Sequence, residues 1–279
     1  MIASGFDIGT RFVKVCIVEG RNVLGYSIEE TGKDMRRIIK AAYKRALERS
    51  GVKKRAVERR MATGYGSELV RKADAVVPEA PCLARAVHAL NPEIRLAVDV
   101  GGLFINVTGV GARGFVDGTL TNDKCAAGSG KFLEMVSETL SVPFDSISDM
   151  ALRSNSPYAI NSQCAVFAES EIISQVNGGR SGEDILAGVL KSIVLRAATL
   201  VERSDASGMV ALCGGISKIP AFRVLFERTI KSDAYIPPLD PQIIAAYGAA
   251  LLAEGRAAVR NKGSVGAACP GHARVMESR

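Results

Sequence analysis

The spacing of hydrophobic and polar residues predicts an α/β protein in which one series of elements occurs twice. Apolar runs bounded by turn residues indicate strands, and an apolar period near 3.6 indicates helices. In the first half, the pattern predicts strands over 2–8, 11–18 and 23–28, a helix over 33–50, a strand over 57–63 and a helix over 79–90. In the second half, it predicts strands over 94–99, 103–110 and 114–120, helices over 128–140, 165–177 and 182–204, a strand over 209–212, a helix over 220–230, a strand over 233–236 and a helix over 241–254.

Each half begins with a strand that runs into an Asp-x-Gly turn and then into a second strand. The two aspartates of these turns, Asp7 and Asp99, are 92 residues apart. This is a repeat of structure rather than of sequence, and it indicates two similar lobes that face one cleft. We expect lobe I over 1–91 and lobe II over 92–240, with a C-terminal helix over 241–256 that completes lobe I.

Composition and charge narrow the class of protein. The chain is 47% hydrophobic and 23% charged, as in globular proteins. It has no apolar run near the ~20 residues that cross a bilayer and no basic leader before an apolar segment, so we expect a cytoplasmic protein with no membrane partner. The net charge is +7, but aromatic residues are not interleaved with the basic ones, so nucleic acid is not an expected partner.

Residues 257–279 are basic and without periodicity, and we expect a mobile tail there.

The first Asp-x-Gly turn, residues 7–10, has the chemistry of a phosphate-binding turn. Gly9 lets backbone N–H groups approach a phosphate, Thr10 adds a hydroxyl donor, and Lys14 offers a cation from the next strand. Asp7 and Asp99 are the predicted catalytic residues, because a carboxylate at each turn suits the water shell of Mg²⁺.

Two further glycine turns follow predicted strands in the second half of the chain. Gly101 and Gly102 repeat the phosphate-binding pattern of the first turn. Gly214, Gly215 and Ser217 come directly after a strand and are expected to contact an adenosine. The chain contains neither GxxxxGK[ST] nor a GxGxxG after its first strand, which excludes a P-loop protein and argues against a Rossmann site.

Two cysteines, Cys125 and Cys164, stand just before predicted helices. A helix N-terminus stabilises a thiolate, and thiolates suit soft metals and iron–sulfur clusters. One chain offers two such thiols and a cubane cluster takes four, so two chains on a symmetry axis would supply the set. Cys16, Cys82 and Cys213 lie in apolar surroundings and are expected to be packed thiols.

These segments resemble one branch of the acetate kinase/sugar kinase/Hsp70/actin superfamily. The chain is similar to the ATP-dependent activators of 2-hydroxyacyl-CoA dehydratases and to the ATPase subunits of class I benzoyl-CoA reductases. The resemblance rests on DIGT at 7–10, ATGYG at 62–66, DVGG at 99–102, NDKCAAG at 122–128, CAVFAESE at 164–171 and GG at 214–215. It implies an α/β fold of two ribonuclease H-like lobes, of the actin and Hsp70 type, around a nucleotide cleft.

The resemblance also implies cofactors and partners. Two subunits would share one [4Fe-4S] cluster through Cys125 and Cys164 of each, and ATP with Mg²⁺ would move the helices that begin near these cysteines. The cluster would then deliver one electron at very low potential. The implied partners are a second ATPase subunit (a paralogue or an identical chain), a larger iron–sulfur acyl-CoA reductase or dehydratase component, and a ferredoxin or flavodoxin donor.

The chain departs from the family pattern at the second phosphate turn. Activators usually read Asp-x-Gly-Gly-Gln-Asp, whereas this chain has Leu103 and Phe104 in place of the last two residues. A glutamine there would position the attacking water, so hydrolysis by this subunit is left open. The alternative is that Leu103 and Phe104 merely pack and another residue orients the water. Arg11 is also bulky beside the first turn.

A heterodimer with a complete second ATPase subunit would explain this departure. The smaller ATPase subunit of class I benzoyl-CoA reductases is about this size, so we favour that type over a stand-alone homodimeric dehydratase activator. Two alternatives of other classes remain. One is a small-molecule kinase of the same superfamily, and the other is a regulatory ATPase that binds nucleotide without iron.

Overall fold

The computed structural model describes residues 1–122, 130–160, 165–204 and 206–260. The strands are β1 (Ile2–Ile8), β2 (Phe12–Glu19), β3 (Asn22–Glu30), β4 (Val57–Thr63), β5 (Ala75–Val76), β6 (Ile94–Val100), β7 (Ile105–Val110), β8 (Val116–Thr121), β9 (Met209–Cys213) and β10 (Ala234–Tyr235). The helices are α1 (Met35–Ser50), α2 (Glu79–Leu90), α3 (Gly130–Thr139), α4 (Ile147–Arg153), α5 (Ala165–Asn177), α6 (Gly182–Glu202), α7 (Pro220–Ile230) and α8 (Ile244–Arg260). The predicted order of elements is confirmed, and the hydrophobic pattern missed only short ones, including β5 and α4.

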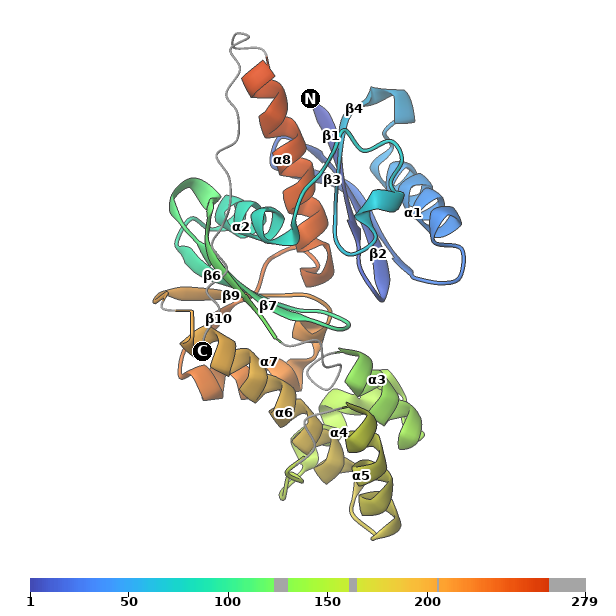
Figure 1. The fold of residues 1–279 in the computed structure, drawn as a ribbon, viewed down its shortest axis with the longest axis vertical. Coiled ribbons are helices and arrows are strands. Elements are labelled where there is room, and N and C mark those ends of the chain that lie inside the picture. Colours follow the sequence, from blue (N-terminus) through green and yellow to red (C-terminus); the bar gives the residue numbers. More distant parts are fainter. Residues whose placement is uncertain (123–129, 161–164, 205, 261–279) are drawn as a thin grey trace, which may run out of the picture.

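Two five-stranded sheets share one topology, which confirms the predicted repeat of structure (Figure 1). The strand orders are β3-β2-β1-β4-β5 and β8-β7-β6-β9-β10. In each sheet the first three strands are antiparallel and the last two lie parallel to the first. The register pairs Asp7 with Lys14 in one sheet and Asp99 with Asn106 in the other. The two Asp-x-Gly turns therefore occupy equivalent positions in the two sheets.

Helices α2 and α8 form the layer between the sheets (Figure 1). Helix α8 packs on β1, β2 and β4, while α2 packs on β6, β7 and β8, and the two helices contact each other. At their crossing, a Cβ on Gly248 would lie 1.8 Å from the backbone oxygen of Cys82, so only glycine permits this approach. Cys16, Cys82 and Cys213 are buried in this layer as predicted.

The C-terminal helix is longer than expected. The chain runs through a 3₁₀ turn at Pro241–Ile243 into α8, which extends to Arg260. Residues 257–260, assigned to the tail from the sequence, are therefore helical. Residues 261–279 lie outside the described residues.

Helix α1 covers the outer face of the first sheet. It contacts β2 and β3 and buries Ile39, Ala42 and Ala46 against them. The helix begins where the side chain of Asp34 accepts a hydrogen bond from the Arg37 N–H, and it ends at Gly51, whose φ is 67°. The predicted end of this helix is confirmed.

Helices α3 to α7 lie beyond the second sheet (Figure 1). Helix α6 packs on β6 and β7, and α4 and α7 pack on α6. Helices α3 and α5 contact each other and also reach α6. The two helices that follow the cysteine segments in the sequence are therefore neighbours in space. None of the helices among the described residues is long and apolar enough to cross a membrane.

Candidate functional site

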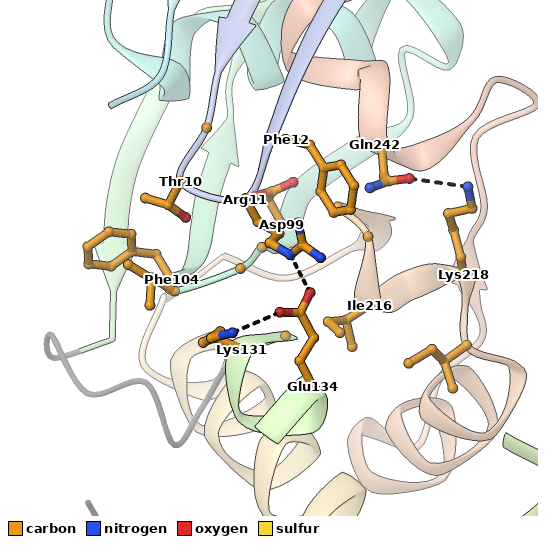
Figure 2. Close-up of a pocket in the computed structure, with 18 of the residues that line it drawn as sticks. Thr10, Arg11, Phe12, Asp99, Phe104, Lys131, Glu134, Ile216, Lys218 and Gln242 are labelled. Atoms are coloured by element: carbon orange, nitrogen blue, oxygen red, sulfur yellow. Dashed lines mark hydrogen bonds and ion pairs between the residues drawn. The ribbon is translucent and has the colours of Figure 1, made fainter. Parts of the chain in front are cut away.

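A cleft of about 770 Å³ lies where the turns of the two sheets face each other (Figure 2). Most of the predicted site residues line it: Asp7, Gly9, Thr10, Lys14, Asp99, Gly101, Gly102, Gly214 and Gly215. Ser217 does not belong to this lining. It is 6% exposed, and its hydroxyl donates to the Gly214 carbonyl oxygen at 2.7 Å. Its side chain therefore stabilises the turn at residues 214–217. The predicted ligands Cys125 and Cys164 lie outside the described residues.

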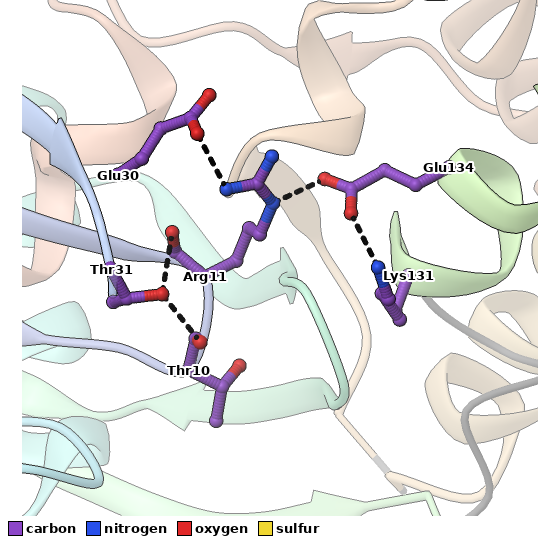
Figure 3. Close-up of polar contacts among 6 residues, drawn as sticks. All are labelled: Thr10, Arg11, Glu30, Thr31, Lys131 and Glu134. Atoms are coloured by element: carbon purple, nitrogen blue, oxygen red, sulfur yellow. Dashed lines mark hydrogen bonds and ion pairs between the residues drawn. The ribbon is translucent and has the colours of Figure 1, made fainter. Parts of the chain in front are cut away.

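The turn between β1 and β2 is held so that its backbone faces the cleft. The Gly9 N–H donates to the Phe12 carbonyl oxygen at 3.0 Å. A Cβ on Gly9 would lie 2.9 Å from Lys14 Nζ, so the glycine leaves room for the lysine. The Thr31 hydroxyl donates to the carbonyl oxygens of Thr10 and Arg11 at 3.0 and 3.1 Å (Figure 3). These hydrogen bonds hold the turn where its residues line the cleft, as an anion site requires.

Three carboxyl groups surround one ammonium on the floor of the cleft. Lys14 Nζ lies 2.8 Å from Asp7 Oδ2, and the exposed fractions of the two side chains are 15% and 3%. Asp99 comes from the second sheet, and Glu79 comes from the first residue of α2. Glu79 also meets the second sheet, since Asn106 Nδ2 donates to its Oε2 at 3.5 Å. The floor therefore joins both halves of the molecule.

The pKa values of the ionisable groups on this floor are shifted, because three carboxyl groups are buried beside one ammonium. Burial raises the pKa of Asp99 to about 6, against the attraction of Lys14, with Asp7 adding to the rise. Burial raises the pKa of Glu79 to about 8, and the charges of Asp99 and Asp7 contribute further. Burial alone would lower the pKa of Lys14, but Asp7, Asp99 and Glu79 together outweigh it and raise the pKa. The floor therefore carries more carboxyl groups than cations, and a cation bound beside it would favour the ionised forms of these carboxyls.

Sequence reasoning missed Glu79. The only local signal was an acidic residue at the start of a predicted helix, which usually just complements the helix dipole. Its place in the cleft depends on how α2 packs between the sheets.

The second phosphate turn is bonded directly to α3. Its Gly101 N–H donates to the Phe104 carbonyl oxygen at 2.9 Å. The first two N–H groups of α3 then donate back to the turn, Gly130 to the Gly101 oxygen at 3.0 Å and Lys131 to the Gly102 oxygen at 2.9 Å. These N–H groups have no partner within the helix. A displacement of the turn is therefore passed to the start of α3.

The third turn closes the other end of the cleft. Gly214 has φ +84°, and a Cβ there would lie 2.5 Å from the Val100 carbonyl oxygen, so this position requires glycine. Lys218 Nζ lies 2.9 Å from Asp240 Oδ2. It also lies 3.2 Å from Gln242 Oε1, as Figure 2 shows. The lining at this end is largely apolar: Ile216, Ile219, Pro220 and Phe144. An apolar end beside a polar floor suits a nucleotide.

Arg11 reaches from the first turn across the cleft to α3 (Figure 3). Its Nε lies 2.6 Å from Glu134 Oε1, and its Nη1 lies 3.1 Å from Glu30 Oε2. Lys131 Nζ lies 3.3 Å from the other oxygen of Glu134. The pKa of Arg11 is raised, because its hydrogen bond to Glu134 outweighs burial. From the sequence, Arg11 was noted only for its bulk, and its partner was not foreseen.

The model of the BadF/BadG/BcrA/BcrD ATPase family matches residues 5–253. The activator of lactoyl-CoA dehydratase from Anaerotignum propionicum is 33% identical over 254 residues, which cover 91% of this chain and 97% of that protein. A subunit of benzoyl-CoA reductase from Thauera aromatica is 31% identical over 261 residues, which cover 90% of this chain and 92% of that protein.

Solved structures agree with these relatives. The Acidaminococcus fermentans (R)-2-hydroxyglutaryl-CoA dehydratase component A superposes with a TM-score of 0.87 at 31% identity, covering 92% of this chain and 99% of that one. The activator of 2-hydroxyisocaproyl-CoA dehydratase from Clostridium difficile, solved with bound ADPNP, has a TM-score of 0.86 at 29% identity, covering 96% and 100%. A ROK hexokinase from Thermus thermophilus, at a TM-score of 0.52 and 16% identity over 93% of this chain and 100% of that one, shares the fold alone. The two-lobed actin-like and sugar-kinase-like fold is confirmed, and the chain belongs to the BadF/BadG/BcrA/BcrD ATPase family.

Proposed function

We propose that this protein is an ATP-hydrolysing activator, which uses nucleotide turnover to drive low-potential, one-electron reduction of a larger acyl-CoA-processing partner. The observation that carries this proposal is the hydrogen-bonded connection between the second phosphate turn and α3. It links the nucleotide cleft to the helix that follows the Cys125 segment in the sequence. A small-molecule kinase would leave the two cysteines before helices unexplained.

The cleft is proposed to bind MgATP through its two phosphate turns. The backbone N–H groups near Gly9 and Gly101 would donate hydrogen bonds to phosphate oxygens, with the Thr10 hydroxyl as a further donor. Asp7 and Asp99 would hold the water shell of Mg²⁺. A divalent cation there favours the ionised form of both carboxyls and offsets the charge of the triphosphate.

Glu79 is proposed to orient and deprotonate the attacking water. Its carboxyl lies on the cleft floor, and its pKa of about 8 is close to the range that suits a general base near neutral pH. This supports the alternative that a residue other than the family glutamine positions the water. Leu103 and Phe104 then line the cleft without preventing hydrolysis by this subunit.

The cysteine pair is proposed to supply half of a cluster site. Cys125 and Cys164 lie outside the described residues, but α3 follows the first in the sequence and α5 begins at the residue after the second. Because α3 and α5 contact each other, two thiols per chain at the starts of neighbouring helices fit a cubane shared by two subunits. When bound, a [4Fe-4S] cluster supplies one-electron transfer at low potential. The role of this chain is to hold the thiolates and to change the position of α3 with nucleotide state.

The partner is proposed to be an acyl-CoA dehydratase component, with a second copy of this chain sharing the cluster and a ferredoxin or flavodoxin as donor. Dehydratase activators are somewhat more similar to this chain than the benzoyl-CoA reductase protein of Thauera aromatica, at 33% against 31% identity. This moves the proposal away from the reductase type favoured from the sequence. The reductase type remains the second candidate, because the benzoyl-CoA reductase subunit of Thauera aromatica matches 90% of this chain at 31% identity.

The test is anaerobic purification of the protein from its native host, followed by iron analysis and EPR of the reduced sample with and without MgATP. We expect about four iron atoms per dimer and a signal that changes with nucleotide. Cys125→Ser should abolish the signal, whereas Cys269→Ser, the matched change of a cysteine outside the proposed ligand pair, should leave it intact. Protein that stays free of iron beside its partners would refute the proposal. Co-purification of a reductase component would favour the second candidate.

A further inference from the structure

We propose that Arg11 and Lys131 form a two-cation site for the terminal phosphate of the bound nucleotide, and that Glu134 occupies this site while the cleft is empty. The inference rests on the proposed nucleotide function of the cleft. It adds to that function the residues that distinguish a triphosphate from a diphosphate. It also explains the arginine that follows the first phosphate turn.

The site lies where the two phosphate turns meet. A Cβ on Gly102 would lie 3.0 Å from Arg11 Cβ and 3.2 Å from Thr10 Oγ1, so the turns touch at Arg11. Lys131 and Glu134 come from the first turns of α3 and line the same cleft. Any group bound between Arg11 and Lys131 therefore touches the first turn and α3 together.

The carboxylate of Glu134 is placed as an anion in a binding site would be. One oxygen lies 2.6 Å from Arg11 Nε and the other lies 3.3 Å from Lys131 Nζ, and the side chain is 18% exposed. The forked guanidinium of arginine binds carboxylate and phosphate oxygens with the same geometry. A phosphate with greater charge can therefore replace this carboxylate on the same two cations.

The lysines of the cleft other than Lys131 form ion pairs away from the proposed phosphate site. Among the described residues of its lining, the lysine and arginine side chains are those of Arg11, Lys14, Lys131 and Lys218. Lys14 is paired with Asp7 on the acidic floor, and Lys218 is bonded to Asp240 at the apolar end. Arg11 and Lys131 instead share one anion, Glu134, so its release makes both of them available for the end of a triphosphate. The second partner of Arg11, Glu30, is 67% exposed and holds it weakly.

Exchange of the two anions changes what joins the halves of the molecule. With the cleft empty, the Arg11–Glu134 pair links the first turn to α3. With a triphosphate bound, Arg11 and Lys131 turn to the terminal phosphate and Glu134 is released, so the direct contact between Arg11 and Glu134 is replaced by one that runs through the phosphate to Lys131. A diphosphate lacks the terminal group and leaves the pair in place. Whether the Arg11–Glu134 pair is formed therefore depends on the bound nucleotide, and its exchange changes the contacts of α3, the helix that follows the Cys125 segment.

The test compares the affinities for Mg-ADPNP and Mg-ADP by titration calorimetry of the full-length protein. Arg11→Met should weaken ADPNP binding about tenfold, equal to about 1.4 kcal/mol, and ADP binding less than about threefold. Lys131→Met should likewise weaken ADPNP binding more than ADP binding. Glu134→Gln removes the competing charge without changing shape, so it should tighten ADPNP binding about threefold or more and leave ADP binding nearly unchanged.

Glu29→Gln is the matched control. Glu29 pairs with Arg45 at 2.6 Å and is 17% exposed, close to the values for Glu134, but it does not line the cleft. It should change neither affinity. Equal weakening of both nucleotides by Arg11→Met, or weaker ADPNP binding in Glu134→Gln, would overturn this inference alone. Failure of the unmodified protein to bind either nucleotide would overturn the proposed function as well.

Discussion

Replacing Glu79 by glutamine is expected to make the nucleotide-free protein more stable above pH 8 and nearly unchanged near pH 5. In the folded protein burial raises the pKa of Glu79 to about 8, compared with an ordinary value of 4.5. Between pH 4.5 and about pH 8, Glu79 therefore keeps its proton in the folded chain and releases it in the unfolded chain. The free energy of unfolding therefore falls as pH rises through this window, and above about pH 8 the loss is complete. Glutamine cannot ionise and avoids this loss.

The size of the effect follows from the same shift. Each pKa unit is worth about 1.4 kcal/mol, so the full interval sets an upper limit of about 5 kcal/mol. The cleft is open to water and Glu79 shares its surroundings with Asp99, so we expect on the order of 2 kcal/mol. For a chain of this size, that corresponds to a rise in Tm of roughly 4–8 °C.

Thermal unfolding measured from pH 5 to pH 9 without nucleotide or Mg²⁺ tests the expectation. The difference in Tm between Glu79→Gln and the unmodified protein should grow from near zero to its maximum above pH 8. Glu93→Gln, the same change at an exposed position, should give a constant difference. A Glu79→Gln difference independent of pH, or a lower Tm of this variant above pH 8, would refute the reasoning. The same variant should hydrolyse ATP about 10²–10⁴-fold more slowly, because a general base contributes that much.

Three further outcomes are expected. Lys14→Met leaves the buried Asp7 carboxylate without its partner and should lower the free energy of unfolding by about 3 kcal/mol, so an unchanged urea midpoint would contradict the ion pair. Gly248→Ala forces α8 away from α2 and should cost about 2 kcal/mol or more in the same assay, while Gly255→Ala, in the same helix with nothing within 4 Å, should be neutral or stabilising. Leu103→Gln should change the steady-state rate of ATP hydrolysis by less than about threefold, because Glu79 is proposed to orient the water, and a tenfold rise would show that Leu103 at the second phosphate turn limits the rate.

The sequence alone determined the order of the long elements and the positions of the three glycine turns. Both are local properties: an apolar period follows from which face of one element is buried, and a glycine turn follows from the φ that one residue must adopt. The register of Asp7 opposite Lys14 also follows from the tight turn between their strands. The short elements β5 and α4 carry too few residues for a period to be recognised.

Only the tertiary structure decided which side chains complete the cleft. Glu79 reaches the floor because α2 packs between the two sheets, and Arg11 meets Glu134 although 123 residues separate them in the chain. Ser217, expected to face the nucleotide, is turned inward because its hydroxyl satisfies the Gly214 carbonyl. The sequence places the backbone turns that can bind phosphate, whereas the charges around them come from distant segments. Their meeting depends on how the two sheets and their helices pack, which no local pattern records.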